Sequence, residues 1–216
     1  MSSLVDLSHR IVSGVQTYPG LPAPIVDAYL SHQDSRPHYT DGTEFQIGHI
    51  EMVMNTATYV DSPFHRFREK PDIAALPLHR LADLEAVCIH THGACLDVAA
   101  LHGLDLRNKA VLIHTGWSQH WGTPHYFENH PFVTRDAAQW LADKEVKHVG
   151  IDSLNIDCIK DGTRPAHTIL LGAGIPITEH LADLGALPDA GFRYFAVPVK
   201  VVGAGSFPVR AFAIIP

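Results

Sequence analysis

Short apolar runs rich in valine and isoleucine recur along the chain, and glycine or proline bounds most of them. Runs of this kind are typical of β-strands. They lie at 25–30, 45–54, 86–90, 110–114, 147–151, 192–202 and 208–215. Helical signals are fewer: Thr134 is suited to cap a helix that runs to Glu145, and shorter helices are expected at 71–84, broken or kinked at Pro77, and at 178–184. The pattern predicts an α/β or α+β domain with mixed or antiparallel sheets.

The chain has 216 residues and no internal repeat or long linker, which favours a single domain over 1–216. Its net charge of −7 offers no basic footprint, so we do not expect it to bind nucleic acid. The longest apolar stretches are shorter than the ~20 residues that span a bilayer, and Asp6 and His9 interrupt any signal peptide. The three cysteines lack a Cys-x-x-Cys spacing. We therefore expect reduced thiols and a cytoplasmic protein without a membrane segment.

A polar stretch at 55–65 directly follows one of the predicted strands. Asn55, Tyr59 and Asp61 share one face if the chain stays extended here. Pro63 should end the strand, and Asp61 and His65 lie on either side of it, where they could converge. Taken alone, this pattern fits a polar loop that closes a strand at least as well as it fits a site.

A second stretch, 165–179, has His167 and Glu179 at the two ends of an apolar segment punctuated by glycine. The two side chains could meet at one site after the chain folds back. Two alternatives remain open: His167 as a hydrogen-bonded core residue, and Glu179 in the first turn of a helix capped by Thr178.

Together the two stretches resemble the cyclase family of metal-dependent hydrolases, of the kynurenine formamidase and isatin hydrolase type. The family signature is H-x-G-T-H-x-D-x-P-x-H, followed much later by a histidine and a glutamate. The matching residues are Thr58, Asp61, Pro63, His65, His167 and Glu179. Weaker matches follow in the family's order at 5–9, 18–20, 76–78, 115–117, 121–124, 150–153 and 208–211. The resemblance implies a swivelling β/β/α fold, a homodimer or homotetramer, and hydrolysis of an amide or related acyl bond at a metal.

The chain departs from the signature at Asn55 and Tyr59, where the family has metal-binding histidines, and at Ala57, where it has glycine. The remaining ligand positions of the family match Asp61, His167 and Glu179. We therefore expect one divalent ion, zinc or manganese, rather than two. Asn55 could add an oxygen ligand and Tyr59 a phenolate. A site without any metal is the open alternative.

His65 matches the family position assigned to acid–base catalysis, and an imidazole can take up and release a proton near neutral pH. Glu179 could assist the water, and Tyr59 could donate to a developing oxyanion if no metal binds. The aromatic residues expected to line a pocket for a small planar substrate, or else to pack in the core, are Phe64, Phe67, Trp117 and Trp121.

The sequence thus predicts a hydrolase of a small amide, formamide, cyclic amide or lactone-like acyl bond. Two alternatives are kept: a metal-free acid–base enzyme, such as a cyclase, isomerase or dehydratase, and a non-catalytic family member that binds a small molecule.

Overall fold

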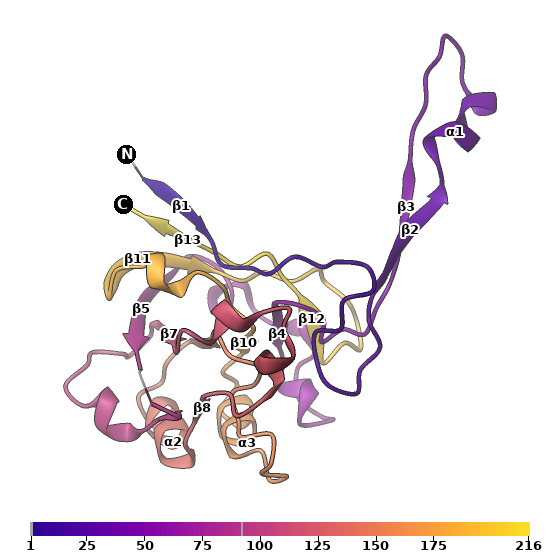
Figure 1. Ribbon diagram of the computed structural model, residues 1–216. Coiled ribbons are helices and arrows are strands. Elements are labelled where there is room, and N and C mark those ends of the chain that lie inside the picture. The colour runs from indigo at the N-terminus through magenta and orange to yellow at the C-terminus, as the bar shows by residue number, and fades with distance from the viewer. Residues whose placement is uncertain (1, 92) are drawn as a thin grey trace.

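The structure is a computed structural model and describes residues 2–91 and 93–216. Its centre is a curled sheet of nine strands in the order β1-β13-β11-β5-β7-β9-β10-β4-β12 (Figure 1). In chain order these strands are β1 (Ser3–Asp6), β4 (Tyr59–Asp61), β5 (Leu84–His90), β7 (Ala110–His114), β9 (His148–Ile151), β10 (Ile177–Glu179), β11 (Ala190–Phe195), β12 (Ser206–Pro208) and β13 (Phe212–Ile215). A small separate sheet pairs β6 (Cys95–Leu96) with β8 (Phe132–Val133).

The middle of the large sheet is parallel, from β5 through β7 and β9 to β10, and the flanking pairs are antiparallel. Strand β7 is apolar along most of its length because both faces of the sheet are covered there. Val111 and Ile113 face a cluster that contains the helices, whereas Ala110 and Leu112 face a second cluster around Phe192. The predicted α/β class with a mixed sheet is confirmed.

Two helices, α2 (Arg135–Asp143) and α3 (Pro165–Gly172), cover one face of the sheet (Figure 1). Thr134 caps α2 by accepting a hydrogen bond of 3.2 Å from the amide of Ala137, as predicted, although α2 ends before Glu145. Helix α3 was not predicted. Its signal was Pro165 at the first helical position, and Gly174 adopts a positive φ of 75° just past its end.

An antiparallel hairpin of β2 (Ile25–Leu30) and β3 (Ile47–Glu51) projects from the body and carries the short helix α1 (His32–Ser35) toward its tip (Figure 1). Most of its strand residues are exposed. The remaining helical segments are 3-10 turns at Arg36–His38, Pro63–His65, Ile73–Ala75, Leu78–Arg80, Val98–Leu101, Trp117–His120, Pro124–Phe127 and Leu184–Ala186.

Three secondary-structure predictions need correction. The segment 71–84 contains two 3-10 turns separated at Pro77 instead of a helix. The helix expected at 178–184 is wrong, because β10 (Ile177–Glu179) is a strand held between β9 and β4. The strand expected over 192–202 is β11, which ends at Phe195, because pairing with β5 and β13 stops there.

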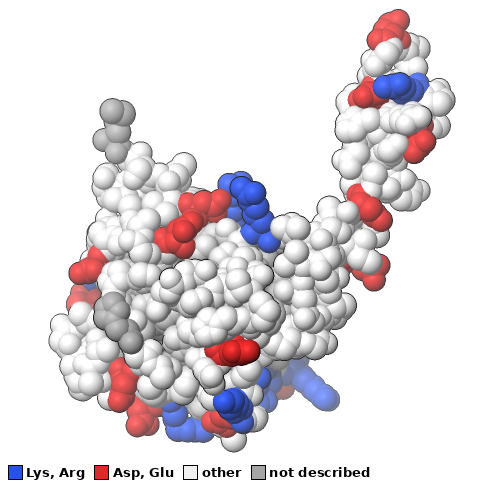
Figure 2. All heavy atoms as spheres, in the orientation of Figure 1, with Lys and Arg blue, Asp and Glu red and all other residues white. Residues whose placement is uncertain are grey.

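None of the helices that the structure describes is long and apolar enough to cross a bilayer. On the face shown in Figure 2, acidic and basic side chains form small groups separated by uncharged surface.

Candidate active site and metal centre

Strand β4 carries two of the predicted site residues on one face. In the antiparallel pairing with β10, Tyr59 lies opposite Glu179, and the Tyr59 hydroxyl donates a hydrogen bond of 2.5 Å to Glu179 Oε2. On the other side of β4, Ser206 lies opposite Asp61, and its hydroxyl donates to Asp61 Oδ1. Direct cross-strand pairing therefore places both carboxylates at one point of the sheet.

His167 enters the same site from the first turn of α3. Asp157 caps this helix: its Oδ1 accepts from the amide of Ala166 at 2.6 Å and its Oδ2 from the amide of His167 at 3.1 Å. The same Oδ2 lies 2.7 Å from His167 Nδ1. With Nδ1 held by a carboxylate, Nε2 is left for the site, and it lies 3.6 Å from Asp61 Oδ2 and 3.5 Å from Glu179 Oε1.

The donor set fits a single divalent cation. Ligand atoms of Asp61, His65 and His167 all lie within 4.8 Å of one another, and Glu179 Oε1 faces the same His167 nitrogen. Asp61 Oδ2 is buried and has no hydrogen-bond partner. A buried carboxylate oxygen without a partner is costly, and a cation would satisfy it. A histidine whose second nitrogen is held by a carboxylate is also the usual form of a metal ligand.

The electrostatics of the cluster also favour a cation. Burial lowers the pKa of His167, but the neighbouring Glu179, Asp157 and Asp61 outweigh it and raise this pKa to about 10. Burial raises the pKa of Glu179 to about 7, against the attraction of His167. Three carboxylates thus surround one imidazole at a buried point, which is a site of negative potential.

Tyr59 and Asn55, which replace the two signature histidines, make other contacts here. Burial raises the pKa of Tyr59 well above its usual value, and the charge of Glu179 adds to this. Tyr59 is therefore a protonated donor to Glu179, whereas a ligand role would require the phenolate. Asn55 Nδ2 donates to Ser206 Oγ at 3.1 Å, which holds the amide beside Asp61.

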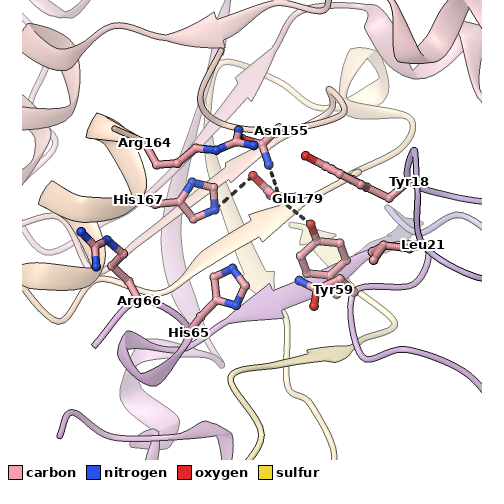
Figure 3. Close-up of a pocket in the computed structure, with 10 residues that line it drawn as sticks. Tyr18, Leu21, Tyr59, His65, Arg66, Asn155, Arg164, His167 and Glu179 are labelled. Carbon is pink, nitrogen blue, oxygen red and sulfur yellow. Dashed lines mark hydrogen bonds and ion pairs between the residues drawn. The ribbon is translucent and has the colours of Figure 1, made fainter. Parts of the chain in front are cut away.

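A cavity of about 320 Å³ opens over this cluster (Figure 3). Among the predicted residues that line it are Asn55, Tyr59, His65, His167 and Glu179, while Asp61 is fully buried. The remaining lining residues are Tyr18, Leu21, Arg66, Asn155 and Arg164, which the sequence did not single out for the site.

The four aromatic residues expected in the pocket lie elsewhere in this structure. The Trp121 ring stacks on His9 at 3.9 Å, and Trp117 Nε1 donates to the carbonyl of Tyr126 at 2.9 Å. Phe67 packs against Gly172 and the core, and Phe64 is half-buried without lining the cavity. Of the two roles expected for these residues, lining a pocket or packing in the core, packing describes their positions here.

Three residues of the site were not predicted from the sequence, Asp157, Asn155 and Arg164, and all of them lie in the loop between β9 and α3. Asn155 Nδ2 lies 3.4 Å from Glu179 Oε2, and its Oδ1 accepts from Arg164 Nη1 at 3.1 Å. No spacing pattern marks these residues. Tyr18 lies in the Tyr-Pro-Gly segment that was noted only as a weak match at 18–20.

A cluster of carboxylates and a histidine on a sheet, open to a small cavity, is the arrangement expected of a metal-dependent hydrolase. The chain belongs to the cyclase family, whose model, described as a putative cyclase, matches residues 5–158. This confirms the family predicted from the sequence.

Relatives and solved structures agree with this assignment. The kynurenine formamidases of Bacillus cytotoxicus and Geobacillus thermodenitrificans are 26% and 27% identical, over 97% and 98% of this chain and 96% and 97% of theirs. Isatin hydrolase A from Labrenzia aggregata shares the fold, with a TM-score of 0.86 and 21% identity over 99% of this chain and 94% of its own. A predicted metal-dependent hydrolase from Bacillus stearothermophilus has a TM-score of 0.77 and 27% identity over 100% of both chains.

Proposed function

We propose that this chain hydrolyses the C–N bond of a small amide, with formamides as the first class to test, at one divalent ion. The observation that carries this proposal is the buried Asp61 Oδ2, which has no hydrogen-bond partner and lies 3.6 Å from His167 Nε2. The similarity of the chain to kynurenine formamidases and to a predicted metal-dependent hydrolase of known structure supports it.

The hydroxyl of Ser206 positions His65 as the acid–base group. This hydroxyl can donate only one proton. Ser206 Oγ donates that proton to Asp61, so toward its other neighbours it can only accept. His65 Nδ1 lies 3.1 Å from Ser206 Oγ, and the tautomer with its proton on Nδ1 donates to this oxygen. Its Nε2 is then unprotonated, on a side chain that lines the cavity, and can take a proton from water and pass it to the leaving nitrogen.

Asp61, His167 and Glu179 would hold the ion, which supplies activation of water and polarisation of the substrate carbonyl when bound. The chain fixes Glu179 for this role through two donors: the amide of Ile156 bonds Oε1 at 2.6 Å and Tyr59 bonds Oε2. Asp157 orients His167 in the same way. The side chains that meet at the site are therefore held in place before substrate binds.

Formanilide, the N-formyl derivative of aniline, gives a direct test, because release of aniline is followed by absorbance. We expect turnover by the purified protein, loss of turnover after dialysis against dipicolinate, and recovery on addition of Zn²⁺ or Mn²⁺. The variant H79Q, on an exposed 3-10 turn, is a control that should behave like the unmodified chain. Turnover that persists after metal removal would favour the metal-free acid–base alternative.

We propose further that the chain works in the cytoplasm as a homodimer or homotetramer on a small-molecule substrate. Two-stranded hairpins are only marginally stable alone in water. The hairpin of β2 and β3 nevertheless exposes apolar side chains at Ile25, Val26, Tyr29, Phe45, Ile47 and Ile50. A second copy of the chain would cover them, and light scattering after gel filtration tests this. The free thiols of the three cysteines support a reducing compartment.

A further inference from the structure

Arg164 has a strained backbone at the point where it enters the cavity. It has a left-handed conformation, with φ 47° and ψ 62°, directly before Pro165 at the start of α3. For a residue other than glycine this conformation costs on the order of 1 kcal/mol or more and persists only where the surroundings impose it. The side chain of Arg164 lines the cavity beside Tyr18 and Asn155 (Figure 3).

The guanidinium of Arg164 forms no ion pair with a carboxylate in the part of the chain that the structure describes. Its Nη1 donates to the neutral Asn155 Oδ1 at 3.1 Å, and the guanidinium also interacts with the neutral side chain of Tyr18. The acid next to it in the sequence, Asp161, instead accepts from the amide and hydroxyl of Thr163, at 2.9 Å and 2.7 Å. Arg164 therefore brings to the cavity a positive charge that no carboxylate of the described residues contacts directly, although Asp161 feels its field.

A second guanidinium lines the same cavity. Arg66 bonds Thr168 Oγ1 through Nε at 3.2 Å and lies over the ring of Phe67, and it too has no carboxylate partner among the described residues. Two unpaired arginines on one small cavity are unusual in a chain with a net charge of −7. Guanidinium groups recognise carboxylates by paired, charge-assisted hydrogen bonds.

We propose that Arg164 binds a carboxylate of the substrate, so that the enzyme selects amides that carry an anionic group close to the scissile bond. This inference rests on the proposed amide hydrolysis and names its substrate class. Arg66 adds positive potential at the same cavity.

Asn155 explains why the carboxylate must lie close to the reacting bond. Its Oδ1 accepts from Arg164 and its Nδ2 lies 3.4 Å from Glu179 Oε2, so a single side chain joins the anion-binding group to the metal-binding carboxylate. A cavity of about 320 Å³ also admits only a small molecule. An aromatic amide with its carboxylate in the ortho position meets both conditions.

A matched pair of substrates tests the proposal: N-formylanthranilate, which has an ortho-carboxylate, and formanilide, which lacks it. We expect kcat/KM of the unmodified enzyme to be about 10- to 100-fold higher for N-formylanthranilate. In R164Q this preference should fall at least 10-fold, and in R164K it should be intermediate, because lysine keeps the charge but loses the paired geometry. R107Q, whose native arginine pairs with Glu145 on the surface, is the control and should keep the full preference.

An equal preference in the unmodified enzyme and R164Q, or a preference for formanilide, would overturn the proposal. If neither amide is hydrolysed, the proposed function fails, and calorimetric titration with anthranilate and aniline still decides the anion site. Binding of anthranilate at least 10-fold tighter to the unmodified chain than to R164Q, with no such difference for aniline, supports Arg164 as the carboxylate-binding residue. Equal binding to both proteins rejects it.

Discussion

Tyr59 and Glu179 face each other across β4 and β10, and the phenol donates a 2.5 Å hydrogen bond to Glu179 Oε2. At the position of Tyr59, the signature that this sequence resembles has a histidine. Here a neutral donor occupies one carboxylate oxygen, and the other, Oε1, faces His167. This pairing is the reason that we propose one ion beside Asp61, where the signature that the sequence resembles implies two.

Restoring both signature histidines should restore the second ion. In N55H/Y59H two imidazoles would meet Asp61 and Glu179, and nitrogen ligands raise the affinity for zinc or manganese. We expect the metal content, measured by plasma mass spectrometry, to rise from about one ion per chain to two. The matched variant N55Q/Y59F, which adds no ligand, should stay at one. An unchanged content in N55H/Y59H would show that these positions do not face the metal centre.

Removing the imidazole of His65 should separate catalysis from metal binding. In H65Q we expect kcat to fall by about 10²- to 10⁴-fold, because the proton acceptor for water is lost. Metal content should not change, since Asp61, His167 and Glu179 remain. A parallel loss of metal would instead make His65 a ligand, as its place within 4.8 Å of the other donor atoms allows. H79Q serves again as the exposed control.

Asp157 should act on the metal through His167. D157N replaces an oxygen that accepts from His167 Nδ1 by an amide, so the imidazole loses its fixed orientation. We expect a 10- to 100-fold loss of metal affinity, measured by competition with a chromophoric chelator. D143N, at the end of α2 and away from the cavity, should leave the affinity unchanged. Equal affinity in D157N and the unmodified chain would rule out this positioning role.

The buried histidines should make the fold sensitive to mild acid. Burial lowers the pKa of His148 from 6.5 to about 4, so between these values the unfolded chain takes up a proton that the folded chain does not. The contribution of His148 to the free energy of unfolding is therefore constant above pH 6.5 and falls as the pH drops toward 4. Burial likewise lowers the pKa of His180 to about 3 and of His9 to about 4.

Urea unfolding at pH 7.5 and pH 5 measures this effect. His148 alone should account for about 2 kcal/mol of the difference between the two pH values. H148Q should therefore lose less stability on acidification than the unmodified chain, even if it is less stable at pH 7.5. The same loss in both proteins would mean that His148 does not remain neutral in the fold.

The sequence predicted those strands and helices whose signals lie in a few neighbouring residues. The apolar runs predicted β5 and β7 because parallel strands are covered on both faces, and Thr134 marked the start of α2 because its hydroxyl caps the helix. The helix predicted at 178–184 was wrong. Thr178 resembles a helix cap, but pairing with β9 and β4 makes β10 a strand.

The site was predicted only in part, for a similar reason. The family signature brought Asp61, His65, His167 and Glu179 together correctly. Asp157 and Arg164 act through contacts that depend on how the loop before α3 folds back on the sheet, and no residue spacing encodes that.

The most direct test of a single metal centre is a titration of metal-depleted protein with Zn²⁺ or Mn²⁺ while formanilide hydrolysis is followed. We expect no turnover without metal, a linear rise to a plateau at one ion per chain, and no recovery in D61N or H167Q. Full turnover in the metal-depleted protein, or a plateau that requires two ions, would contradict it.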